Sequence, residues 1–337
     1  MVGLPAIRTH NASLKTLSPG LVGVFVGGTS GIGFSTAREF VRNVEAPHVY
    51  LVGRNQAEAT RIIDELQKLN PSSQLNFIKS DVSLLRSVDE VCKEIKQKES
   101  KVNLLFMTAG YLTFAGREET TEGLDRKFSL HYYARMRFVQ QLSPLLTAAA
   151  NTPDPNGSLS RVISVLDPNV RAIPNFEDLS LKATFSLKNC ATHAIAMNNF
   201  ALERWSKEMP GTSFIHTSPG IVPTGVARPL GPVWSGMMKL VVLTTKPWQI
   251  PLKESGERHL YAATAPQFAP KAKSERAGDS VKGLDGRAGS GAYAISSDVE
   301  IHEQNVRSNT LREEGAEKRI WEHTEEVFRK IEETGKY

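Results

Sequence analysis

The sequence predicts an α/β fold, a doubly wound parallel sheet with helices on both faces. Short runs of β-branched and aliphatic residues alternate along the chain with helix-length segments whose apolar residues recur at helical spacing. The first of these runs leads directly into a glycine-rich turn, Gly27 to Gly33, and then into a helical pattern. With 337 residues, 40% of them apolar, the chain can bury one large core.

The alternation predicts strands and helices in a regular order. The strands are expected at Val22–Val26, Val49–Val52, Asn76–Lys79, Leu104–Met107, Arg161–Val165 and Phe214–Thr217, with a last strand at Ala292–Ser296. The helices between them are expected at Gly31–Asn43, Gln56–Leu69, Leu84–Lys98, Glu122–Ala148 and Lys188–Glu208. In such a sheet, ligands bind outside the carboxyl ends of the strands.

The pattern divides the chain into one domain with two appendages. An irregular leader, 1–18, precedes a domain over 19–300, and a helical extension follows over 301–337. Within the domain, residues 223–256 combine methionine, tryptophan and proline, which favours a mobile substrate flap. Ordinary packing of one helix, or an amphipathic segment on a membrane surface, would also account for this composition. Residues 270–291 read as a solvated loop.

Composition excludes several classes of protein. The net charge of +5 is spread along the chain without a basic tract, so nucleic acid is not an expected partner. The only cysteines, Cys92 and Cys190, lie far apart, which argues against a disulfide framework and against a metal site. No apolar run reaches the roughly 18 residues of a membrane span. We therefore expect a reduced, cytoplasmic protein without a transmembrane segment.

The glycine-rich turn predicts a dinucleotide-binding site. Its glycines allow the backbone to turn tightly and to approach a pyrophosphate, and the following helix presents free N–H groups to the anion. The residues expected at the phosphates are Gly27, Thr29, Ser30, Gly31, Ile32 and Gly33. A glycine-rich turn without a ligand is the alternative.

The end of the second strand indicates which nicotinamide cofactor binds. An acidic residue there would accept hydrogen bonds from a free ribose hydroxyl, whereas a guanidinium can hold the additional phosphate of NADP(H). This position carries Arg54, which favours NADP(H). A surface arginine at a strand end is the alternative interpretation.

Further motifs resemble the short-chain dehydrogenase/reductase superfamily, whose fold is of the Rossmann type. They are Asp81-Val82 after the third strand, Thr108-Ala109-Gly110 after the fourth, Arg161–Val165 as the fifth and Ser218-Pro219-Gly220 after the sixth. The resemblance covers about residues 18–225 and extends to fungal enzymes of secondary metabolism, through segments such as Glu122-Gly123-Leu124-Asp125 and His131-Tyr132-Tyr133-Ala134-Arg135.

The resemblance implies roles for further residues. Asp81 and Val82 would border the adenine, Ala109 and Gly110 would lie under the ribose, and Pro219, Gly220 and Thr224 would receive the nicotinamide amide. Members of the superfamily commonly pair through the fourth and fifth helices, so a homodimer is expected.

The catalytic positions of the superfamily are altered in this sequence. Its chemistry uses a tyrosine, a lysine four residues later, a serine and an asparagine. Alignment of the fifth helix places Phe185 at the tyrosine position and Asn189 at the lysine position, while Asp167 stands at the serine position and His131 at the asparagine position. A shift of one to three residues would restore Ser164 but would not create the tyrosine and lysine pair.

Two of the replacements can transfer protons. A carboxylate and an imidazole near the nicotinamide, Asp167 and His131, would form an acid–base pair at neutral pH. Alternatively, Asp167 begins a turn with Pro168, and His131 makes only local hydrogen bonds.

Three functions are consistent with these observations. The first is an NADP(H)-dependent oxidoreductase with a non-standard proton donor, which reduces a carbonyl or alkene, or oxidises an alcohol, of a small apolar secondary metabolite. The second is a non-redox isomerase, dehydratase or cyclase on the same scaffold. The third is an NADP(H)-sensing binding protein without catalysis.

Overall fold

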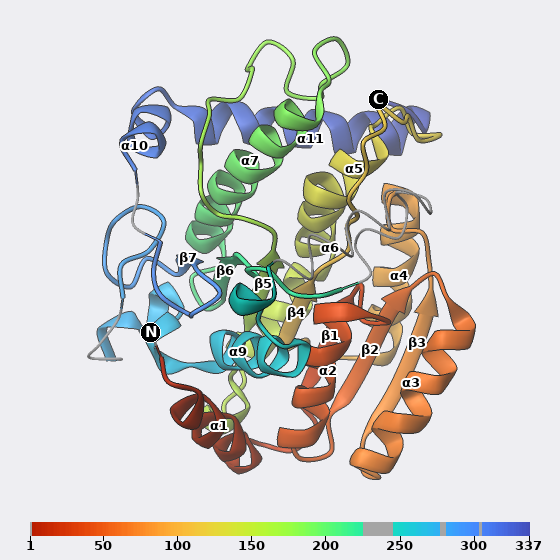
Figure 1. Ribbon diagram of the computed structural model, residues 1–337, viewed down its shortest axis with the longest axis vertical. Coiled ribbons are helices and arrows are strands. Elements are labelled where there is room, and N and C mark those ends of the chain that lie inside the picture. Colours follow the sequence, from red (N-terminus) through yellow and green to blue (C-terminus); the bar gives the residue numbers. More distant parts are fainter. Residues whose placement is uncertain (1, 225–244, 277–280, 303–304) are drawn as a thin grey trace.

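The computed structural model describes residues 2–224, 245–276, 281–302 and 305–337 (Figure 1). Seven parallel strands form one sheet in the order β3-β2-β1-β4-β5-β6-β7. Their bounds are β1 Val22–Val26, β2 His48–Gly53, β3 Gln74–Lys79, β4 Leu104–Met107, β5 Arg161–Val165, β6 Ser213–Thr217 and β7 Ala292–Ile295. The predicted doubly wound sheet is confirmed, and every strand presents its carboxyl end at the same edge.

Helices cover both faces of the sheet (Figure 1). One face packs against α2 Gly31–Asn43, α3 Gln56–Leu69 and α9 Leu252–Thr264, and the other against α4 Leu85–Lys98, α6 Ala134–Ala150 and α7 Leu187–Glu208. A hydrophobic cluster fills each interface, as the β-strands of a sheet buried on both faces require. No described helix has the apolar length that a bilayer span requires.

The predicted helix Glu122–Ala148 is wrong at its beginning. The chain instead forms the single turn α5 Arg126–Phe128, a π-turn at Ser129–Tyr133 and then α6. Asp125 starts the helix by accepting a hydrogen bond from the Phe128 N–H, and the buried Glu122 side chain caps α4 through the backbone N–H groups of Leu85 and Arg86. Glu122 and Asp125 therefore cap the starts of two different helices, α4 and α5.

The leader is not irregular, because most of it is the helix α1 Leu4–Ser13. This helix packs on α9. Nε and Nη2 of Arg8 each donate to one carboxylate oxygen of Glu257 at 3.1 Å. The buried Asn11 amide also donates to the Glu257 carbonyl. Sequence reasoning missed α1 because its apolar residues are few and its stability comes from α9.

The predicted flap 223–256 lies largely in residues 225–244, outside the described residues. Its last residues, from Leu252, belong to α9, which packs closely on α2: a Cβ added to Gly256 would lie 2.4 Å from Ser35 Oγ. That part of the prediction is wrong, because the segment is a core helix. The predicted loop 270–291 contains a short 3-10 helix at Lys271–Arg276.

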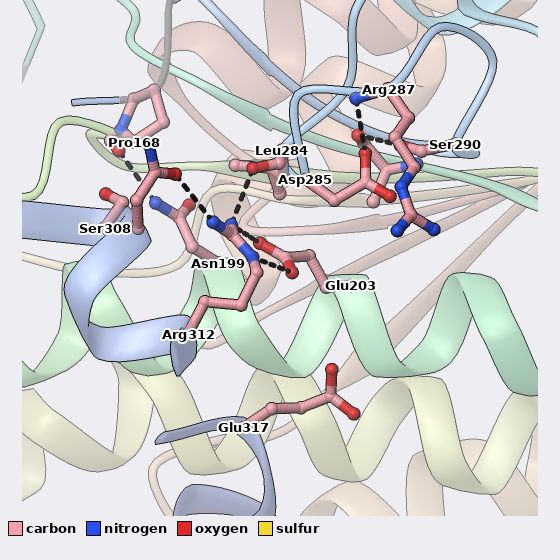
Figure 2. A network of polar contacts seen from close by, with 12 residues as sticks. Pro168, Asn199, Glu203, Leu284, Asp285, Arg287, Ser290, Ser308, Arg312 and Glu317 are labelled. Atoms are coloured by element: carbon pink, nitrogen blue, oxygen red, sulfur yellow. Dashed lines mark hydrogen bonds and ion pairs between the residues drawn. The ribbon is translucent and has the colours of Figure 1, made fainter. Parts of the chain in front are cut away.

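The C-terminal extension forms α10 Val306–Glu313 and α11 Ala316–Thr334. Figure 2 shows how Arg312 of α10 binds the buried Glu203 carboxylate of α7 in a bidentate ion pair and also donates to the Leu284 carbonyl. Burial raises the pKa of Glu203, and the Arg312 charge opposes that shift. The extension is thus bound to the domain by a buried charge pair.

Helix α11 lies across α7 (Figure 1), and its Glu332 pairs with Arg137 near the start of α6. The Trp321 ring packs edge to face on Trp205 of α7 with 5.1 Å between the ring centroids. Preceding α6, the Tyr132 and Tyr133 hydroxyls bond to Thr324 and His323. The C-terminal helix thus contacts α7 and the start of α6, the two helices at which the resemblance implies a homodimer interface.

We expect Trp321→Ala to destabilise the protein by about 3–5 kcal/mol, because it removes a buried aromatic side chain and leaves a cavity. Urea unfolding measures this change. The exposed neighbour Glu322 provides the control, since its alanine variant should change the free energy of unfolding by less than about 0.5 kcal/mol. Equal stability of the Trp321 variant and the wild type would show that α11 contributes little to the fold.

Candidate functional site

The glycine turn after β1 brings two backbone segments into contact. Gly27 has a φ of +88°, and a Cβ added to Gly33 would lie 2.4 Å from the Gly27 carbonyl oxygen and 2.7 Å from Thr108 Oγ1. Only glycine fits at Gly33, because any side chain would push α2 away from β1 and β4. The turn therefore packs the amino end of α2 tightly against the carboxyl ends of the strands.

The amino end of α2 is open to an anion. Ser30 occupies the N-cap position, but its side chain makes no capping hydrogen bond. An uncapped helix start leaves backbone N–H groups and a partial positive charge available to a phosphate. Thr224 lies beside this turn, since a Cβ on Gly31 would be 3.3 Å from its Cγ2, and Thr29 lies over Gly53. Ile32 packs inward against the hydrophobic core.

Arg54 and Asp81, both expected at the adenosine end of the cofactor, differ in whether their side chains already have partners. Arg54 is exposed at the end of β2 and forms no ion pair among the described residues. Asp81 accepts from the Ser83 N–H and hydroxyl and pairs with Arg126 at 2.9 Å. Burial raises the pKa of Asp81, but these hydrogen bonds and the charges of Arg126 and Arg54 outweigh it and lower the pKa. Val82 is buried beside it.

Ala109, Gly110 and Gly220 lie at the same edge of the sheet. Ala109-Gly110 follows β4, and Pro219-Gly220 follows β6 with a φ of +68° at Gly220. A Cβ added to Gly110 would lie 2.6 Å from His131 Nε2. The imidazole of His131 therefore lies directly against the turn that is expected under the ribose.

His131 is a buried, neutral group in the π-turn that precedes α6. Its residue is 9% exposed, and no hydrogen bond to its ring is found among the described residues. Burial, with smaller contributions from the positive charges of Arg135 and Lys127, lowers its pKa to about 3. At neutral pH the ring therefore carries one N–H donor and one acceptor nitrogen.

A network that the sequence analysis missed lies beneath His131. The buried Arg135 guanidinium donates to Ser164 Oγ at 2.7 Å, to the Val165 carbonyl at 2.9 Å and to the Ala109 carbonyl at 3.2 Å. It thus joins the carboxyl ends of β4 and β5. The sequence feature that could have revealed this network is the charge of Arg135, which lies one helical turn after His131 on the helix face that packs on the sheet.

Asn198 of α7 completes this network. Ser164 donates to its Oδ1 at 3.0 Å, and its Nδ2 donates to the His131 carbonyl at 2.8 Å. Asn198 thus joins α7 both to β5 and to the π-turn that carries His131. Ser164 is fully buried inside β5, so its hydroxyl lies below the site and not at its surface.

Asp167 and Asn189 have other partners. One Asp167 oxygen accepts from the Asn169 N–H, and the other lies 3.0 Å from the Arg171 guanidinium. Asn189 lies in the first turn of α7 and donates to the Thr184 carbonyl. No hydrogen bond joins Asp167 to His131 in the described part of the chain. The turn-forming role that the sequence analysis left open for Asp167 is the one the structure displays.

Comparison with known proteins identifies related sequences along the whole chain. The family model of short chain dehydrogenases matches residues 22–165. Oxidoreductase AN1596 of Emericella nidulans is 40% identical over 97% of this chain and 98% of its own length. The short-chain dehydrogenase/reductase SAT2 of Stachybotrys chartarum is 28% identical over 95% of this chain and 96% of its own.

Solved structures share the fold at lower identity. The NADPH-bound carbonyl reductase from chicken fatty liver is 17% identical, with a TM-score of 0.55 over 86% of this chain and 100% of its own. The L-sorbose reductase of Gluconobacter frateurii in complex with NADPH and L-sorbose is 18% identical, with a TM-score of 0.54 over 83% of this chain and 96% of its own. These likenesses support the Rossmann-type architecture.

The depressed pKa of His131 makes stability fall with acid. Its pKa is about 3 in the folded protein against 6.5 when exposed, so between these values the unfolded chain binds a proton that the folded protein does not. The contribution of the neutral ring to the free energy of unfolding is therefore full above about pH 6.5 and declines below it. His131→Asn, which cannot titrate, should lose about 2 kcal/mol less than the wild type between about pH 7.5 and pH 5 in urea unfolding. Parallel losses in the two proteins would contradict a buried neutral imidazole.

Proposed function

Since this chain belongs to the short-chain dehydrogenase/reductase superfamily, we propose that it is an NADP(H)-dependent oxidoreductase of small apolar metabolites with a non-standard proton donor. The expected chemistry is reduction of a carbonyl or alkene, or oxidation of an alcohol. The observation that carries the proposal is the position of His131, whose neutral imidazole lies against Gly110 at the carboxyl end of β4.

The cofactor side of the proposal rests on geometry that suits a dinucleotide. The uncapped start of α2 would hold the pyrophosphate, and Arg54 would hold the 2′-phosphate that distinguishes NADP(H) from NAD(H). The turn at Ala109 and Gly110 would lie under the nicotinamide ribose. NADPH supplies the hydride when it is bound.

His131 is the group we assign to the substrate oxygen. A neutral imidazole cannot act as a cationic acid, but its N–H can donate a hydrogen bond that polarises a carbonyl. Reduction would place negative charge on the substrate oxygen. His131 would then give that oxygen the proton of its single N–H and take a proton from water at its other ring nitrogen, so that the ring stays neutral. We assign no role in this step to Asp167 and Asn189, whose side chains bind Arg171 and the Thr184 carbonyl.

Exposed apolar side chains at this edge of the sheet support an apolar substrate. Leu112 and Phe114 follow β4, Ile173 follows β5, and Ile221 follows β6 beside Gln249, next to Trp248. Their residues are 43% to 72% exposed, and large exposed apolar groups in loops that surround one site mark a binding surface. The fungal origin of the related oxidoreductases agrees with a substrate from secondary metabolism.

The altered catalytic positions favour a non-redox isomerase, dehydratase or cyclase as the second candidate. Phe185 and Asn189 stand where the superfamily carries the tyrosine and lysine of its hydride chemistry, and Asn189 is bound to the Thr184 carbonyl. A non-redox reaction would rely on His131 as its proton-transfer group. Turnover of a substrate without consumption of NADPH would identify this class.

We expect NADPH to bind the wild type, and Arg54→Ala to weaken that affinity by about 10- to 100-fold, because the variant loses charge-assisted hydrogen bonds to the 2′-phosphate. Affinity for NADH should change little. Calorimetric titration measures both, and Arg61→Ala, which removes an exposed arginine from the next helix, serves as the control. Similar NADPH affinities in the Arg54 variant and the wild type would exclude this residue as the phosphate ligand.

A screen of apolar ketones, aldehydes and enones that follows NADPH absorbance tests the reaction itself. With a substrate found, His131→Ala should lower kcat by about 100-fold or more while NADPH still binds. Asp167→Asn is the matched control and should retain activity within a few fold. If Asp167→Asn removes activity and His131→Ala does not, the assignment of His131 is wrong.

A further inference from the structure

Arg135 is a buried positive charge whose hydrogen-bond partners are all neutral. Its residue is 3% exposed, and besides Ser164, Val165 and Ala109 it donates to the Leu130 carbonyl. Among the described residues, no carboxylate lies within ion-pair distance of it. A buried charge is normally paired, because its removal from water is costly. Hydrogen bonds to neutral groups satisfy its donors but leave its charge uncompensated.

The charge persists at neutral pH and acts on the site. Burial lowers the pKa of Arg135 only to about 9, so the guanidinium stays protonated. Its charge also contributes to lowering the pKa values of His131 and of His216 on β6, after burial, which is the main cause in both cases. The field of Arg135 therefore acts on His131, beside the turn that follows β4, and on His216 of β6.

Neighbouring charges do not cancel this field. Lys127 adds a second positive charge that acts on His131. On adjoining segments, Asp167 pairs with Arg171. Asp125 accepts from the neutral Phe128 and Glu118 N–H groups and keeps its charge, but the charges that shift the pKa of His131 are those of Arg135 and Lys127. The charges that act on the ring beside Gly110 are therefore positive.

We infer that Arg135 makes this site bind NADPH more tightly than NADP⁺ and so biases the enzyme toward reduction. This inference rests on the proposed function, which places the nicotinamide ribose over Ala109 and Gly110 and the substrate oxygen at His131. Because hydride passes from the ring to the substrate carbon, the nicotinamide ring then lies near His131. The two forms of the cofactor share their phosphates and adenosine, and they differ by one positive charge on the nicotinamide ring. Contacts to the phosphates cancel in the comparison, whereas a buried positive charge near the ring disfavours the oxidised form alone.

If Arg135 had only a structural role, its replacement would change the affinities for NADPH and NADP⁺ in a different way. If the guanidinium only joins β4 to β5, its replacement would weaken the binding of both forms of the cofactor equally. The ratio of the two dissociation constants separates this case from an electrostatic one, because general loosening of the site cancels in the ratio.

The test is calorimetric or fluorescence titration of NADPH and NADP⁺ into the wild type, Arg135→Gln and Arg135→Lys. The wild type should bind NADPH more tightly. Arg135→Gln keeps an amide donor but loses the charge, and should reduce this preference by about tenfold. Arg135→Lys keeps the charge and should retain the preference even if both affinities fall.

Arg161→Gln is the matched control. Arg161 is also a buried arginine whose pKa burial lowers, to about 10, but it lies at the amino end of β5, at the opposite edge of the sheet. Its variant should leave the ratio unchanged.

Two results would overturn the inference: tighter or equal binding of NADP⁺ by the wild type, which needs no variant, or an unchanged ratio in folded Arg135→Gln. Failure of the wild type to bind either form would instead overturn the proposed function.

Discussion

The site depends on one constraint: a single buried guanidinium joins the carboxyl ends of β4 and β5 by donating hydrogen bonds to neutral oxygen atoms of both strand ends. Arg135 binds the carbonyls of Ala109 and Val165 and so fixes the two strand ends between which the nicotinamide is expected. Asn198 donates to the His131 carbonyl and so ties the π-turn to α7. This arrangement sets the ring of His131 against Gly110 and keeps it neutral. Of the four altered catalytic positions, all among the described residues, only His131 is thus joined to this network.

The parts of the structure that depend on local pattern were predictable. Buried parallel strands are nearly continuous apolar runs, and the observed bounds of β1, β4 and β5 agree with the predicted ones. The glycine turn was predictable because its spacing reflects a steric need, shown by the 2.4 Å approach at Gly33. The network of Arg135 was not, since its partners Ser164 and Val165 lie 29 and 30 residues away and no local spacing in the sequence pairs them with Arg135. Helix α1 was missed for a similar reason, because its main polar partner is Glu257.

The C-terminal extension is structurally part of the domain. Its buried ion pair between Arg312 and Glu203 ties α10 to α7 (Figure 2). Asn305, which caps α10, also donates to the Val170 carbonyl in the loop that follows β5. That loop begins beside Asp167 at the edge where substrate is expected. The extension therefore packs on α7 and is tied to the loop that follows β5.

The central claim is that the carboxyl edge of this sheet holds NADP(H) with its nicotinamide against Gly110 and His131. A crystal structure of the protein grown with NADPH tests it most directly. The account predicts the pyrophosphate at the start of α2, the 2′-phosphate on Arg54 and the nicotinamide ring within contact distance of His131. A nucleotide bound elsewhere, or a nicotinamide placed away from Gly110, would contradict the account.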